Sequence, residues 1–137
     1  MRTFFDASAF VKRYVEESGS QQVDEICQET SDLALSVICV PEIMSALNRR
    51  VRERILLPQA YSVIKQHLSQ DIRDAEIVNL TPHIIASAIS LLETSPLRAM
   101  DALHVACALE WGVDLFVSSD QRQLAAAEKV NLKTKRV

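Results

Sequence analysis

The sequence predicts an α/β fold, a three-layer α/β/α sandwich around a central, mainly parallel five-stranded sheet. Short apolar, β-rich runs alternate with helical patterns of about ten or more residues, as in parallel strands joined by helical crossovers. Most of the strand segments are apolar without strict alternation, which indicates that helices cover both faces of the sheet. The length of 137 residues, with 2 glycines, 4 prolines and no visible repeat, predicts one domain over residues 1–137.

The expected elements follow from apolar patterning and from helix-start signals. Strands are expected near residues 2–5, 34–38, 76–80 and 114–118, with a weaker one near 131–136. Helices are expected near 7–16, 20–30, 40–54, 58–73, 82–93, 98–111 and 120–128. Pro41, Pro58, Thr81-Pro82 and Ser95-Pro96 stand where helices begin, and Gly112 stands where one ends.

Composition narrows the class of protein. A net charge of −3 is not that of a typical nucleic-acid binder, so a polyanionic substrate would need a local basic patch or bound cations. The three cysteines form no CxxC pair and are expected to be small buried thiols. No signal peptide or apolar stretch long enough to span a membrane is visible, which predicts a cytoplasmic protein.

Four acidic residues lie at positions where an α/β sheet collects functional groups. Asp6 and Asp120 directly follow expected strands, and Glu42 opens the helix after another. Each also has a structural explanation, because Asp caps helices and the helix dipole favours a carboxylate in the first turn.

Asp101 is harder to explain structurally. Its helix is expected to begin between Pro96 and Arg98, which would place Asp101 beyond the cap positions, on one face with Val105 and Ala108. A buried carboxylate has to be paired, protonated or bound to a metal. A salt bridge to Arg98 is the alternative to a functional role.

The four carboxylates can converge at one edge if the first strand is central and the fourth strand lies beside it. Mutual repulsion in such a group is relieved by a hard divalent cation, Mg²⁺ or Mn²⁺, which also binds phosphate oxygens. The matching chemistry is metal-assisted phosphodiester hydrolysis.

Several ordered segments carry a family resemblance. These are FFDASAFVKRYVEE, VPEIMSAL, RAMDALHVACALEWGVDLFVSSD and QRQLAAAEKVNLKTKRV. Together they resemble the PIN-domain nucleases, most closely the VapC-type toxins of type II toxin–antitoxin systems, over essentially the whole chain.

The resemblance implies roles for individual residues. Asp6, Asp101 and Asp120 would be the principal catalytic and metal-site carboxylates, and Glu42 would hold metal-bound water or act as a base. Ser8 matches the hydroxyl of the D-x-S/T opening, and Ser118 takes the place of the usual Thr in T-x-D. The implied reaction is in-line attack by metal-activated water, leaving a 5′-phosphate and a 3′-hydroxyl.

Basic residues supply candidate RNA contacts. Lys12 and Arg13 lie about two turns from Asp6, Arg49 shares a helix face with Glu42, and Arg98 precedes Asp101. A solvated, basic helix end is the alternative for the Arg49 segment. His104, although it shares a helix side with Asp101, is expected to be a packed and hydrogen-bonded histidine.

The resemblance also implies partners: an RNA substrate such as tRNA or rRNA, a cognate VapB-type antitoxin and a second copy in a homodimer. The apolar faces of the helices at 20–30 and 40–54 are candidates for those protein contacts. Two other hypotheses remain open: the chain is a PIN-like module that binds RNA or protein without cleavage, or it is a receiver-type phosphoacceptor domain. A receiver-type domain requires paired acidic residues after the first strand and a lysine after the last strand. This chain does not match that pattern cleanly.

Overall fold

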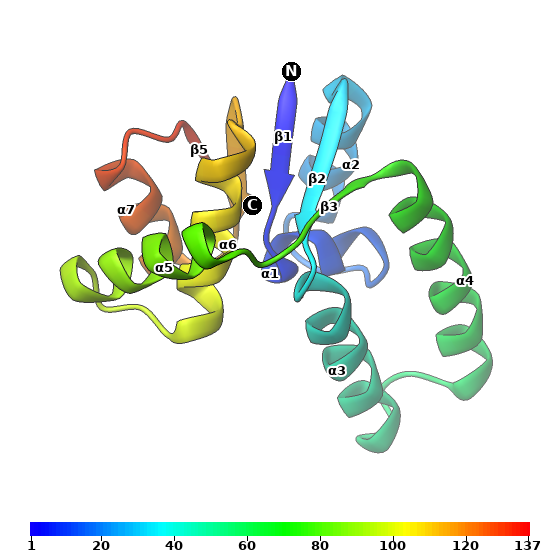
Figure 1. The fold of residues 1–137 in the computed structure, drawn as a ribbon. Coiled ribbons are helices and arrows are strands. Elements are labelled where there is room, and N and C mark those ends of the chain that lie inside the picture. Colours follow the sequence, from blue (N-terminus) through cyan, green and yellow to red (C-terminus); the bar gives the residue numbers. More distant parts are fainter.

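The computed structural model describes all 137 residues, which form helices around a five-stranded sheet of order β3-β2-β1-β4-β5 (Figure 1). The strands are β1 (Arg2–Phe5), β2 (Asp32–Ser36), β3 (Glu76–Val78), β4 (Leu115–Ser118) and β5 (Thr134–Arg136). All four strand pairings are parallel. The predicted α/β/α sandwich is confirmed, and β1 is central with β4 beside it, as the convergence of the four acids requires.

The helices agree with the predicted segments within a few residues, with one exception. They are α1 (Ala7–Phe10), η1 (Val11–Arg13), α2 (Ser20–Glu29), α3 (Cys39–Arg52), α4 (Pro58–Asp74), α5 (Pro82–Thr94), α6 (Ala99–Trp111) and α7 (Gln121–Lys129). The single helix predicted over 7–16 is instead one α-helical turn followed by a 3₁₀ turn that ends at Arg13. The aromatic and β-branched residues of this segment, Phe10, Val11, Tyr14 and Val15, have only modest helix propensity.

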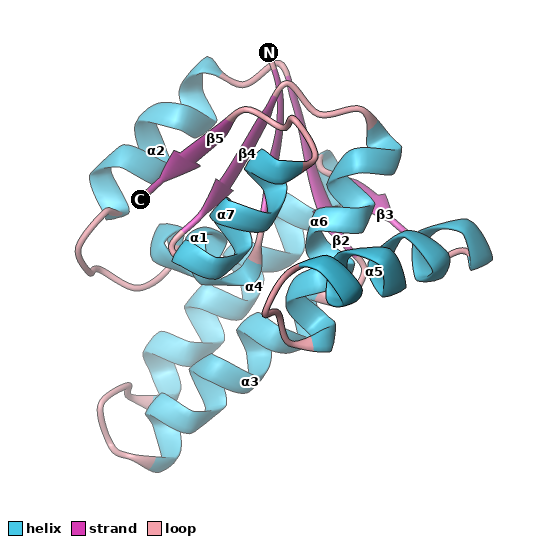
Figure 2. Cartoon of the chain, turned by 90° about the vertical axis from the view of Figure 1, so that its left-hand side faces the viewer, coloured by secondary structure: helices cyan, strands magenta, loops and turns pink.

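The sheet carries a separate apolar core on each face, because successive strand residues point to opposite sides. Phe4 and Phe116 stack on the face covered by α5, α6 and α7, with ring centroids 6.0 Å apart. Phe5 and Leu35 contribute to the core under the helices from α1 to α4. Figure 1 shows the two groups of helices on either side of the strands, and in Figure 2 the group of α5, α6 and α7 faces the viewer.

The carboxyl ends of the strands define one edge of the sheet. Asp6 immediately follows β1, and Ser119 and Asp120 follow β4. Since α6 leads into the start of β4, the first turn of α6 lies at this same edge. Chain direction alone therefore brings residues from both ends of the sequence together.

The apolar faces expected to bind partners are used inside the protein. Val23 and Ile26 of α2, and Ile43 and Leu47 of α3, are buried in the core, which overturns that expectation. Exposed apolar side chains lie elsewhere: Ile55, Leu57 and Val63 near the turn between α3 and α4, and Ile85, Ile89 and Leu92 on α5. No helix has the length and apolar character needed to cross a membrane.

Candidate active site

Asp6 is the buried centre of the site at the carboxyl edge. Its side chain is almost fully enclosed, with 1% of the residue surface exposed. Asp6 caps α1, as its position in the sequence allowed, by accepting a hydrogen bond from the Ala9 N–H at 3.0 Å. The cap is only one of several interactions at this carboxylate.

Three side chains donate further hydrogen bonds to Asp6. The Ser8 hydroxyl lies 2.8 Å from Oδ1 and 2.7 Å from Oδ2, and the Ser118 hydroxyl donates to Oδ2 at 2.8 Å. The Gln123 amide also donates to Oδ2, at 2.8 Å. Ser8 and Ser118, the two hydroxyl residues that the family resemblance singled out, therefore both contact the Asp6 carboxylate.

Asp101 lies in the first turn of α6, two residues after the helix begins at Ala99. The expectation that it lies beyond the cap region is therefore wrong. Arg98 has extended backbone angles and precedes the helix, so the first turn starts later than the Pro96 signal suggested. The alternative salt bridge between Arg98 and Asp101 is not formed, and the side-chain partner of Asp101 is Gln123.

Gln123 joins the two carboxylates and was not among the predicted site residues. Its Nε2 donates to Asp6 Oδ2 at 2.8 Å and to Asp101 Oδ1 at 3.1 Å. The residue is only 2% exposed, and its Oε1 has no hydrogen-bond partner. The only sequence signal was the D-x-x-Q spacing from Asp120, which more usually indicates a capping box.

Glu42 lies in the first turn of α3 and contacts His104 of α6. The buried His104 ring meets Glu42 Oε1 through Nε2, whereas Nδ1 has no partner. The expectation of a packed, hydrogen-bonded histidine is confirmed. The Glu42 side chain remains about one-third exposed, and its second oxygen forms no hydrogen bond.

Asp120 caps α7 by accepting hydrogen bonds from the Arg122 and Gln123 backbone N–H groups, at 2.8 and 3.4 Å. Its own N–H donates to the Ser118 hydroxyl at 2.9 Å. Asp120 thus shares Ser118 with Asp6, and the helix that it caps delivers Gln123 to the site.

The four acids also influence one another electrostatically. Burial raises the pKa of Asp101, and the negative charges of Asp120, Asp6 and Glu42 raise it further. Burial raises the pKa of Asp6 even though His104 and the hydrogen bonds from Ser8 and Ser118 act in the opposite direction. Such shifts show that the ionised carboxylates are poorly compensated by positive charge.

A divalent cation suits the chemistry of these donors. Carboxylate oxygens are the ligands that Mg²⁺ and Mn²⁺ prefer, and a cation would relieve the repulsion that raises the pKa of Asp101. In the observed side-chain arrangement, however, no three His, Cys, Asp or Glu groups are placed to hold a metal ion. The metal role of the four acids stays a prediction, and binding requires Asp6 and Asp101 to exchange partners.

An open cleft of about 490 Å³ adjoins the acids. Asp101 and Asp120 line it together with Arg98, Gln121 and Arg122. Arg98 therefore lies beside the carboxylates as predicted, and Arg122 is a second guanidinium that the sequence analysis missed. Guanidinium groups at an acidic cleft can contact the phosphates of a nucleic acid.

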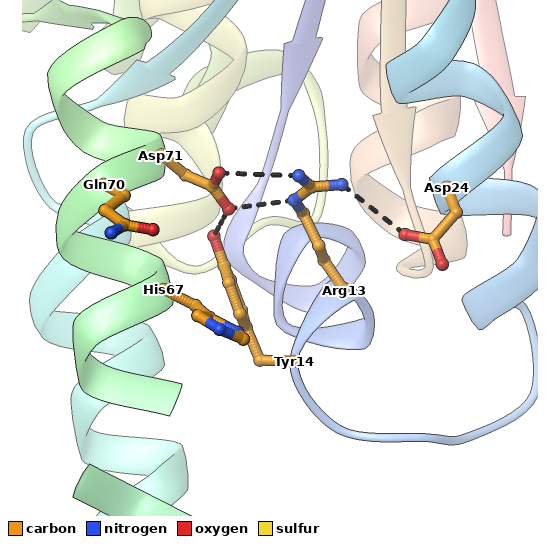
Figure 3. Close-up of a pocket in the computed structure, with 6 residues that line it drawn as sticks. All are labelled: Arg13, Tyr14, Asp24, His67, Gln70 and Asp71. Carbon is orange, nitrogen blue, oxygen red and sulfur yellow. Dashed lines mark hydrogen bonds and ion pairs between the residues drawn. The ribbon is translucent and has the colours of Figure 1, made fainter. Parts of the chain in front are cut away.

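Two other predicted RNA contacts are engaged within the protein. Lys12 Nζ donates to the backbone oxygens of Ser18 and Val137, at 2.6 and 3.1 Å. Arg13 pairs with Asp71 at 2.9 Å and Asp24 at 3.5 Å (Figure 3). Contact with RNA would have to compete with these interactions, and for both residues that role stays a prediction.

Arg49, the remaining predicted contact, is exposed on α3 and forms no ion pair. It lies two turns beyond Glu42 on the same helix. Its position is compatible with the predicted contact and with a solvated helix end, and its role is untested.

Known proteins share both the sequence pattern and the fold. Two curated relatives, Ribonuclease VapC45 and Ribonuclease VapC49 of Mycobacterium tuberculosis, are each 29% identical over 109 residues, covering 80% of this chain and 76% of theirs. The structure of Mycobacterium tuberculosis VapC20, described as a Sarcin-Ricin loop cleaving toxin, superposes with a TM-score of 0.70 and 17% identity, covering 90% of this chain and 94% of that one. Rickettsia felis VapBC2, solved with a promoter DNA fragment, gives a TM-score of 0.72 at 12% identity, covering 100% and 99%.

These likenesses confirm the resemblance to VapC-type PIN domains noted in the sequence motifs. The sequence model of the PIN domain family matches residues 3–129, which contain all four acids and Gln123. The chain belongs to the PIN domain family.

Proposed function

We propose that this protein is a metal-dependent endoribonuclease toxin of the VapC type, which hydrolyses RNA phosphodiester bonds and is inhibited by a cognate antitoxin. The observation that carries the proposal is the convergence of Asp6 and Asp101 on one amide, that of Gln123, at the carboxyl edge of the sheet. Asp120 and Glu42 lie close enough to raise the pKa of Asp101. The ribonuclease names of the curated relatives support the same activity.

The acids would hold a divalent cation, Mg²⁺ or Mn²⁺. Asp6 and Asp101 are the central candidates, with Asp120 and Glu42 at the periphery. When bound, such an ion binds phosphate oxygens, stabilises the charge that develops on them and makes water a stronger nucleophile. Asp6, Asp101, Asp120 and Glu42 would repel one another and the RNA less strongly with such an ion bound.

The remaining residues would orient the substrate and move a proton. Arg98 and Arg122 line the cleft beside Asp101 and would hold the phosphates on either side of the scissile bond. Glu42 has one oxygen bonded to His104 and one that forms no hydrogen bond, on a side chain about one-third exposed. That second oxygen would accept the proton of the attacking water, while His104 would fix the orientation of the carboxylate.

The proposed partners follow from the relatives. VapBC2 of Rickettsia felis and a toxin–antitoxin complex from Klebsiella pneumoniae share the fold of this chain, which supports a VapB-type antitoxin as its partner. We include a homodimer and a cytoplasmic location in the proposal. Light scattering of the purified protein, alone and with the antitoxin, measures both assemblies.

The activity is tested with purified protein and fragments of tRNA and rRNA in Mg²⁺ or Mn²⁺. The wild type should cleave RNA to give 5′-phosphate and 3′-hydroxyl ends, and EDTA should abolish cleavage. Asp101→Asn should reduce cleavage by about 100-fold or more, the scale on which loss of a transition-state electrostatic contact acts.

Asp74→Asn is the matched control, because it removes an exposed carboxylate of α4 that forms no ion pair. It should cleave like the wild type. Equal cleavage by Asp101→Asn, or cleavage that persists in EDTA, would contradict the proposed mechanism. RNA binding without cleavage under any metal condition would favour the non-catalytic binding module.

A further inference from the structure

Gln123 occupies a position between two carboxylates that no packing requirement explains. It is 2% exposed and comes from α7, yet its amide reaches Asp6 Oδ2 and Asp101 Oδ1 at 2.8 and 3.1 Å. The assignment of nitrogen and oxygen is fixed by the network, because a carbonyl oxygen in that place would face two carboxylate oxygens. A neutral donor therefore bridges two negative charges.

The hydrogen bonds to Asp6 leave no acceptor site free for a cation. An ionised carboxylate offers about four lone-pair sites. Asp6 meets four donors, which are the hydroxyls of Ser8 and Ser118, the N–H of Ala9 and the amide of Gln123. A metal ion that binds Asp6 must therefore displace one of them.

Three of the four donors are fixed in place. The Ala9 N–H belongs to the first turn of α1. The Ser8 hydroxyl accepts from the Ser119 N–H at 3.1 Å, and the Ser118 hydroxyl accepts from the Asp120 N–H at 2.9 Å. Each backbone donor occupies one lone pair of its hydroxyl, which helps to hold the hydroxyl hydrogen toward Asp6.

Gln123 is the one donor of the four that neither helical backbone nor a hydrogen bond from outside the two carboxylates holds in position. Its Oε1 is buried without any hydrogen-bond partner, so the amide forms no side-chain hydrogen bond beyond those to the two carboxylates. An unpartnered buried carbonyl is unfavourable, so the oxygen end of the amide contributes no stabilisation that would be lost if the side chain moved. The Gln123 amide is thus the donor that gives way at least cost.

We propose that the Gln123 amide is a placeholder for the cation: it bridges Asp6 and Asp101 until a divalent ion takes over that bridge, and it thereby weakens metal binding. This inference rests on the metal site in the proposed function and adds a residue that controls occupancy. In protein stripped of cations, Gln123 stabilises the site, whereas in the loaded protein its two hydrogen bonds to the carboxylates are broken.

The test compares Mn²⁺ binding and thermal stability in Gln123→Met and wild type. Methionine keeps the length of the side chain but has no amide donors. Calorimetric titration should show that Gln123→Met binds Mn²⁺ about tenfold more tightly, since breaking a hydrogen bond to a charged group costs enough to shift an equilibrium by that factor. Its melting temperature should be lower than that of the wild type in EDTA, and the gap should close in saturating Mn²⁺.

Two further variants keep the result interpretable. Gln123→Asn withdraws the amide by one methylene and should tighten binding by a smaller factor, even if Gln123→Met folds poorly. Gln66→Met alters an exposed glutamine of α4 and should bind Mn²⁺ like the wild type. Circular dichroism of all variants confirms that they are folded.

The outcomes separate this inference from the proposed function. If the wild type binds Mn²⁺ and Gln123→Met binds it equally or more weakly, Gln123 is a structural or positioning residue and the placeholder role is wrong. If the wild type binds neither Mn²⁺ nor Mg²⁺, the metal-dependent function fails and this inference fails with it.

Discussion

Two carboxylate sites in this protein differ in how the negative charge is compensated, and the pKa shifts at the two sites have opposite directions. Asp101 lies among other acids, and its pKa is raised by burial and by the charges of Asp120, Asp6 and Glu42. Asp71, in the cluster of Figure 3, accepts hydrogen bonds from Arg13 at 2.9 Å and Tyr14 at 2.5 Å. Burial alone would raise the pKa of Asp71, but these donors bring it below its ordinary value.

The opposite pKa shifts distinguish the Asp71 cluster, which stabilises the fold, from the acids around Asp101, which are suited to binding a cation. The Asp71 cluster ties α4 to η1 and, through the contact of Arg13 with Asp24, to α2. Asp71 is paired with the Arg13 guanidinium and accepts from Tyr14, so this carboxylate has little to gain from a further ion. Asp6 and Asp101 at the carboxyl edge are held by neutral donors and form no ion pair, which is unfavourable for folding but favourable for binding a cation.

The largest expected effect comes from Asp6→Asn. The asparagine amide would present its own donors to a site already filled with donors, leaving at least one unsatisfied. We expect the free energy of unfolding to fall by about 2–3 kcal/mol, with loss of RNA cleavage. Urea denaturation of the variant beside Asp74→Asn measures this, and unchanged stability would show that the four donors do not hold an ionised Asp6.

Asp71→Asn should lower the free energy of unfolding by less than Asp6→Asn does, and it should leave RNA cleavage unchanged. The loss should be about 1 kcal/mol at pH 7, because the pair with Arg13 is partly solvent-exposed. The ionised form of Asp71 is stabilised in the folded state, so its contribution is fully present above the ordinary Asp pKa of 3.8 and disappears as the pH falls through the lowered folded value.

The difference in free energy of unfolding between the wild type and Asp71→Asn should therefore be constant near neutrality and should narrow below about pH 4. Urea denaturation from pH 3 to pH 7 follows it. A gap that widens on acidification, or a drop in cleavage at pH 7, would remove the contrast between the two sites.

Asp101→Asn should give the smallest change in stability, with the opposite sign. Removing the charge relieves repulsion by Asp120, Asp6 and Glu42, and the asparagine oxygen can still accept from Gln123. In EDTA at pH 7 we expect the free energy of unfolding to rise by about 0.5 kcal/mol, in the same variant that loses cleavage. A variant that is less stable than the wild type would show that Asp101 is already well compensated.

Local patterns were sufficient to predict most of the architecture and the four acids. Apolar runs, helix-start prolines and Gly112 located the elements, because these signals act over a few residues. The boundaries failed where local signals compete: Pro96 suggested too early a start for α6, so Asp101 was placed beyond a first turn to which it belongs. The segment after Asp6 likewise became a 3₁₀ turn instead of a longer helix.

The sequence by itself determined the α/β sandwich, the family and the positions of Asp6, Glu42, Asp101 and Asp120, because each depends on short patterns in a fixed order. Tertiary structure alone decided which partner each group meets. It bonded Glu42 to His104, engaged Arg13 with Asp71 and inserted the Gln123 amide between Asp6 and Asp101. These contacts join residues far apart in the chain, and they depend on how helices pack against a sheet whose strand order no local pattern specifies.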